Sequence, residues 1–83
     1  MDQLYHRLDK AEKAIAQVKN KQARMDLLKM VRTIDSAIVA AAMESVECRR
    51  HKKETPRYRD LVQKVDDLLS TLEQHITFAS LLG

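Results

Sequence analysis

The stretch Ser36-Ala-Ile-Val-Ala-Ala-Ala-Met43 is apolar around the whole circumference of a helix for two turns. A surface helix carries a single apolar stripe, so a helix that is apolar all round has to be covered on several sides. Its alanines are small and strongly helix-forming, which lets neighbouring helices approach closely. The stretch therefore predicts the middle of a central helix with other helices packed on it, in an all-α protein.

The composition supports a small helical domain. The 83 residues allow one domain, spanning 1–83, and a single Gly and a single Pro leave few turn signals for a sheet with hairpins. Cys48 is the only cysteine, so an intrachain disulfide is excluded. A chain without a disulfide is what a reducing compartment would allow. The sequence shows no signal-peptide pattern and no apolar run of about 18 residues. We expect a cytoplasmic protein without a membrane span.

Two apolar stripes run through the first fifty residues and point to nearly opposite sides. The first comprises Leu4, Leu8, Ala11, Ile15, Val18, Gln22 and Met25, and the second Leu27, Val31, Ile34, Ile38 and Ala41. They fit either one helix reaching residue 53 or two helices broken between about 19 and 26, with Asn20 at the end of the first and Asp26 as the next N-cap. Helices of fifty residues are rare in small domains, so we favour a helix over about 3–20 and another over about 27–53.

The clearest boundary in the chain is Thr55-Pro56. Thr is a good N-cap, Pro suits the first helical position, and the residue before a Pro is pushed out of the helical region. A third helix over about 56–80 would then form an antiparallel hairpin with the second, in a coiled-coil-like bundle. Its broad apolar face comprises Tyr58, Leu61, Val62, Val65, Leu68, Leu69, Leu72, Ile76 and Ala79.

The sequence offers little for catalysis, cofactors or metals. The only Gly is residue 83, so no glycine loop can hold a phosphate, and no Ser/His/Asp or Cys/His arrangement is evident. Cys48 and His51 stand three residues apart, but a structural zinc site needs four protein ligands. We expect a non-enzymatic protein without cofactor or metal.

A basic cluster surrounds the predicted hairpin turn. It comprises Arg49, Arg50, His51, Lys52, Lys53, Arg57 and Arg59. Such a cluster could grip phosphates, which makes a small dimeric RNA- or DNA-binding regulator the alternative function. Glu47, Glu54 and Asp60 lie among these residues, and the net charge is only +3. Basic residues in the last turn of a helix are also what the helix dipole favours.

One family resemblance adds to this interpretation. The hairpin region combines a helix ending in Glu47-Cys48-Arg49-Arg50, a short polar turn, Pro56 with Tyr58 two residues on, and a Leu/Val heptad helix. With these features it resembles the small helical co-chaperones of type III secretion needles. The resemblance covers about 40–76, and the basic first helix departs from it. It implies a cytoplasmic role beside a helical-repeat chaperone, keeping an aggregation-prone needle subunit monomeric. The family's apolar contact face would map onto Tyr58, Leu61, Val65, Leu68 and Leu72.

We therefore expect a protein–protein interaction module, either a small chaperone or adaptor or an oligomerisation domain. Two helices cover each other on one face only, so part of the apolar surface should stay open in a monomer. This open set comprises Val39, Ala42, Met43, Val46, Phe78 and Leu82. Exposed apolar patches of this kind usually mark interaction surfaces. The expected partner is another protein or a second copy, giving a dimer or larger assembly.

Overall fold

A computed structural model describes residues 2–81, which form three helices: α1 (Asp2–Ala16), α2 (Lys21–His51) and α3 (Pro56–Leu81). The predicted all-α fold is confirmed. α2 and α3 run antiparallel as a long hairpin, and α1 folds back along α2. The bundle is 49 Å long and at most 17 Å across.

The first break in the chain lies earlier than predicted. Asn20 is the N-cap of α2, and its side-chain oxygen accepts a hydrogen bond from the Ala23 N–H at 2.9 Å. Asp26, predicted to cap this helix, lies inside it, and Asn20 does not end the first helix. Asn is as good an N-cap as Asp, so residues 21–26 can join the helix that follows.

Short contacts close the turn between α1 and α2 without Gly or Pro. Val18 lies in the turn, is buried, and donates its N–H to the Ile15 carbonyl. The Val18 carbonyl accepts a hydrogen bond from the Arg24 guanidinium at 3.0 Å. A buried Val and a cap therefore replace the usual turn residues.

The second turn matches the prediction closely. α3 starts at Pro56, and the Thr55 hydroxyl accepts the Tyr58 N–H at 3.1 Å. The same hydroxyl donates to Glu44 at 2.8 Å, which ties the cap to α2. Lys52 ends α2 in the left-handed region with φ 57°, so a Lys stands where Gly is more usual.

Replacing Thr55 by Ala should lower the free energy of unfolding by about 1–2 kcal/mol, because the cap and its link to Glu44 both disappear. Thr55→Ser keeps the hydroxyl and should stay close to wild type. Thermal melts followed by circular dichroism compare the two variants. Equal melting midpoints for wild type and Thr55→Ala would contradict this role.

All three helices contribute to one core. Its buried members are Leu8, Ala11, Ile15, Val18, Leu27, Val31, Ile34, Ile38, Val65, Leu69, Leu72 and Ile76. The second predicted stripe thus packs as expected, whereas Met25 of the first is exposed. Because Met25 lies beyond the turn and inside α2, it no longer belongs to the face of α1.

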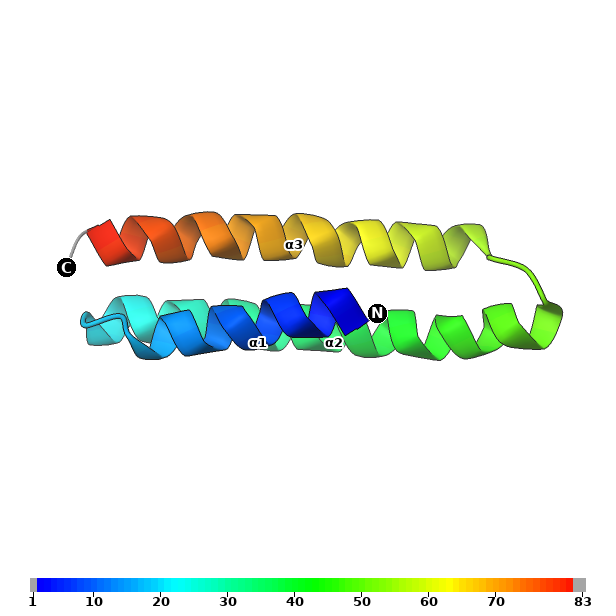
Figure 1. The fold of residues 1–83 in the computed structure, drawn as a ribbon, viewed down its shortest axis with the longest axis horizontal. Coiled ribbons are helices and arrows are strands. Elements are labelled where there is room, and N and C mark those ends of the chain that lie inside the picture. Colours follow the sequence, from blue (N-terminus) through cyan, green and yellow to red (C-terminus); the bar gives the residue numbers. More distant parts are fainter. Residues whose placement is uncertain (1, 82–83) are drawn as a thin grey trace.

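α1, the helix outside the hairpin, covers only part of the α2–α3 hairpin. α1 has 15 residues against 31 in α2, about half the length at a common rise per residue. Figure 1 shows α1 beside the first part of α2 and the last part of α3. Among the described residues, the end of the hairpin next to the α2–α3 turn consists of two helices alone. The candidate functional site lies on this part of α2.

Candidate functional site

An apolar stripe is exposed on the second half of α2. Val39, Met43 and Val46 are 48%, 68% and 53% exposed, and their spacing of four and three places them on one side of the helix. We call these three residues the α2 stripe. Its exposure confirms the expectation that part of the apolar surface stays open.

The α2 stripe is exposed because this segment of α2 is apolar on more sides than its neighbours cover. Ile38 and Ala41 of the same segment are fully buried. Adjacent residues on a helix point about 100° apart, so Val39 faces away from the contacts that bury Ile38. α1 lies beside the first part of α2 only (Figure 1). The α2 stripe is left facing solvent.

The apolar face of α3 is largely used inside the bundle. Val65 and Leu72, predicted as partner-binding residues, are fully buried, and Tyr58, Leu61 and Leu68 are partly buried. The face packs on α2 and, further along, on α1. The prediction that Val65 and Leu72 bind a partner is therefore corrected, because no partner can reach them in the closed bundle.

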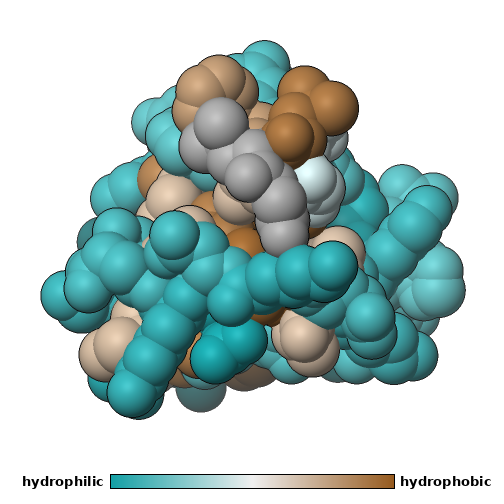
Figure 2. All heavy atoms as spheres, turned by 90° about the vertical axis from the view of Figure 1, so that its left-hand side faces the viewer, coloured by the Kyte–Doolittle hydropathy of each residue, from teal (hydrophilic) through white to brown (hydrophobic). Residues whose placement is uncertain are grey.

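A second exposed apolar region lies where α3 ends. Phe78 is 64% and Leu81 is 81% exposed, and Figure 2 shows hydrophobic side chains among hydrophilic ones at this end of the bundle. A hollow of about 420 Å³ between α2 and α3 is lined in part by Leu27, Met30 and Phe78. The exposure predicted for Phe78 is confirmed, and Leu82 lies outside the described residues.

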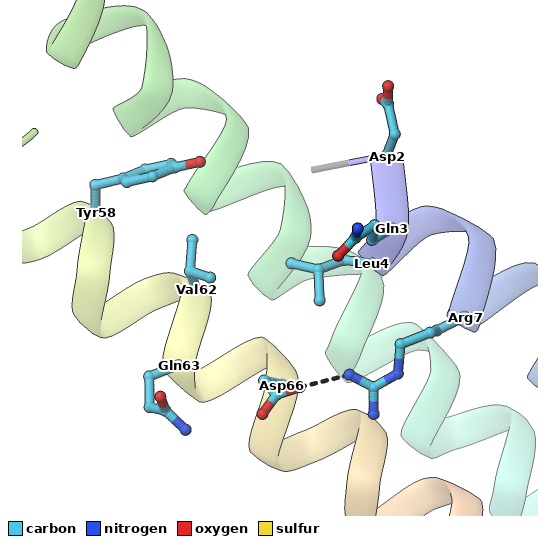
Figure 3. A pocket seen from close by; sticks show the side chains of 8 residues that line it. All are labelled: Asp2, Gln3, Leu4, Arg7, Tyr58, Val62, Gln63 and Asp66. Atoms are coloured by element: carbon cyan, nitrogen blue, oxygen red, sulfur yellow. Dashed lines mark hydrogen bonds and ion pairs between the residues drawn. The ribbon is translucent and has the colours of Figure 1, made fainter.

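A hollow of about 540 Å³ lies where the start of α1 meets α3 (Figure 3). Leu4 from α1 and Val62 from α3 point into it from opposite sides, and Tyr58 extends across its far end. Arg7 reaches across toward Asp66 at its lower edge. The lining mixes apolar and charged side chains, and two of the charged ones, Arg7 and Asp66, are paired with each other.

Arg7 links α1 to α3. Its guanidinium donates to Asp66 and, at 2.7 Å, to Glu73, with the Ser70 hydroxyl at 3.5 Å. Hydrogen bonds to Glu73 and Asp66 raise the pKa of Arg7 above its ordinary value, so this side chain stays charged. Nothing in the sequence predicts this contact. The polar positions 66, 70 and 73 share one side of α3, but their partner depends on how α1 is placed.

Replacing Arg7 by Ala should lower the free energy of unfolding by about 1–2 kcal/mol. Arg7 is 30% exposed and its two partners 48%, so solvent screens the pairs and the carboxylates stay hydrated. Arg7→Lys keeps the charge but lacks the planar fork that reaches two carboxylates, and should fall in between. Urea unfolding of both variants measures the difference. If Arg7→Lys lowered the free energy of unfolding as much as Arg7→Ala does, the positive charge would contribute nothing to stability here.

The basic cluster at the hairpin turn is partly neutralised. Arg50 pairs with Glu47 at 3.5 Å, Arg57 with Glu44 at 3.6 Å and Arg59 with Glu54 at 3.5 Å. Within residues 2–81, Arg49, Lys52 and Lys53 have no ion-pair partner. Three of the six Arg and Lys residues in the cluster thus already face a carboxylate, which weakens the electrostatic footprint that nucleic acids require.

Neither a metal-binding cluster nor a membrane-spanning helix is found among residues 2–81. No group of three or more His, Cys, Asp or Glu side chains between residues 2 and 81 is placed to hold a metal ion. No helix in this part of the chain combines the length and apolar character needed to cross a membrane.

Comparison of the chain with protein-family models, with curated proteins and with solved structures found no match.

Proposed function

We propose that this chain is a non-enzymatic protein–protein interaction module that binds an apolar helix face of another protein chain through the α2 stripe. The observation that supports this most is the exposure of Val39, Met43 and Val46 together, on one side of a helix whose Ile38 and Ala41 are fully buried. A three-helix bundle could have placed polar residues here at no cost to its core. Helix-in-groove recognition uses apolar anchors at this spacing.

The narrower form of the proposal is a small cytoplasmic helical chaperone or adaptor. Its support is the resemblance of residues 40–76 to co-chaperones of type III secretion needles, and this region contains most of the α2 stripe. Two residues of the family's contact face, as mapped here, are buried. The chain would therefore use the outer side of α2 rather than the whole face of α3.

A matched pair of variants tests the proposal. Met43→Glu places a charge in the middle of the α2 stripe, and Gln74→Glu adds the same charge at an exposed position of α3. Wild type and Gln74→Glu, used as baits in lysate of the source cells, should retain the same set of proteins. Met43→Glu should lose those proteins while keeping the helical circular dichroism spectrum. Equal retention by all three baits would contradict the proposal.

A salt series on the same baits separates this function from nucleic-acid binding. Phosphate contacts release counterions, so retention through the basic cluster would fall steeply as salt rises. Retention through apolar side chains should change little. Loss of all retained proteins after nuclease treatment would contradict the proposal and favour the alternative.

A further inference from the structure

The charges on either side of the α2 stripe are arranged symmetrically. Asp35 stands four residues before Val39, and Arg50 stands four residues after Val46. Both charged side chains are exposed. Asp35 makes no ion pair within the described residues, and Arg50 makes only an open one with Glu47 at 3.5 Å. Each end of the stripe thus carries an exposed charge: Asp35 is unpaired within the described residues, and Arg50 would have to share its charge between Glu47 and a partner.

This symmetry makes the stripe complementary to itself in one orientation. A two-fold axis between positions 42 and 43 places Val39 opposite Val46 of a second copy and Asp35 opposite Arg50 of that copy. Both ends then pair opposite charges, and Met43 of each copy lies beside the axis. A parallel arrangement would instead set Asp35 against Asp35 and Arg50 against Arg50, which is repulsive.

Neighbouring parts of the molecule leave room for this contact. The α2 stripe points about 100° away from Ile38, which faces the core, so a second α2 on the stripe would not compete with the core contacts of Ile38. In the two-fold arrangement, position 53 lies opposite position 32 of the other copy. A continuous α2 would therefore bring Lys53 close to Arg32, which carries the same charge. α2 ends at His51, so Lys53 does not continue the helical face.

We propose that the chain forms an antiparallel two-fold dimer through the α2 stripe, with Asp35 and Arg50 pairing at both ends. This inference rests on the proposed function and names the partner helix as α2 of a second copy. The contact spans 16 positions of α2, about 24 Å of helix. A contact between two single helices falls in the size class of weak complexes. The dimer should therefore dissociate in the micromolar range.

Analytical ultracentrifugation of the full chain from micromolar to millimolar concentration tests the dimer. Wild type and Gln74→Glu should show a reversible monomer–dimer equilibrium, and Met43→Glu should remain monomeric. Asp35→Arg and Arg50→Asp should each weaken association about tenfold, since each change replaces two attractive pairs by repulsive ones. The double variant Asp35→Arg/Arg50→Asp should restore it. No recovery in the double variant would overturn the proposed pairing.

Cysteine crosslinking tests the orientation. In a Cys48→Ser background, Val39→Cys and Val46→Cys together should oxidise to a dimer whose disulfides join position 39 to position 46. Mass spectrometry of the digested dimer identifies the linkage. Disulfides joining 39 to 39 and 46 to 46 would overturn the antiparallel arrangement.

The failure of this inference is distinguishable from failure of the proposed function. A wild-type chain that stays monomeric at millimolar concentration overturns the dimer. If Met43→Glu then still loses the proteins retained from lysate, the α2 stripe binds a different protein and the proposed function stands. If Met43→Glu retains them, both proposals are overturned.

Discussion

Replacing Ile38 by Ala should lower the free energy of unfolding by about 2–5 kcal/mol, the largest effect we expect from one substitution. Ile38 is fully buried within the common core of the bundle. Truncation removes its transfer free energy and leaves a cavity that close-packed neighbours fill only in part. A domain of this size has little stability to spare, so the variant should be partly unfolded at 37 °C.

The adjacent residue supplies the control. Val39→Ala removes two methyl groups from a side chain that is 48% exposed, and should change stability by less than about 0.5 kcal/mol. Urea unfolding of Ile38→Ala and Val39→Ala compares the two sides of one helix directly. Similar losses for both would mean that the α2 stripe is covered in solution more fully than the monomer shows.

Replacing Ala41 by Leu should lower the free energy of unfolding by about 1–3 kcal/mol, because Ala41 is fully buried and a larger side chain would have to displace its neighbours. For a domain of this size, each kcal/mol lowers the melting midpoint by about 4–8 °C. The intrinsic helix propensity of Leu is close to that of Ala, so the loss would report packing. Thermal melting followed by circular dichroism measures it.

Ala16→Leu is the matched control for Ala41→Leu, since Ala16 is exposed at the end of α1. It should melt within a few degrees of wild type. An Ala41→Leu variant that is equally stable would show that α2 does not approach its neighbours closely at this point. The interpretation of the segment 36–43 as the packed centre of the fold would then fail.

The sequence predicts the hairpin well because its signals are local. Thr55 and Pro56 place the start of α3 by cap and backbone geometry alone, and both are where predicted. The core residues of α2 and α3 follow from spacing. The break between the first two helices lies at residues 17–20, slightly earlier than the predicted 19–26, and the cap of α2 is Asn20 rather than Asp26. Both residues are suitable caps, and periodicity cannot choose between them.

The candidate site could be predicted only in part. Exposure of Val39, Met43 and Phe78 follows from counting apolar sides against available neighbours. Spacing places Val65 and Leu72 on the apolar face of α3, but it does not determine whether that face packs inside the bundle or against a partner. The Arg7 contact with Asp66 and Glu73 likewise depends on the placement of α1, about sixty residues away along the chain.

Methyl NMR of the methionines tests most directly whether the α2 stripe is the interaction surface. Met43 lies at the centre of the stripe, Met25 is exposed near the start of α2, and Met30 is partly buried against the core. In a chain labelled at the methionine methyl groups, the spectrum is recorded while a retained protein, or an excess of unlabelled chain, is added. We predict that the Met43 signal shifts or broadens while Met25 and Met30 stay in place. Demonstrated binding that leaves Met43 unchanged and moves Met25 or Met30 would contradict the account.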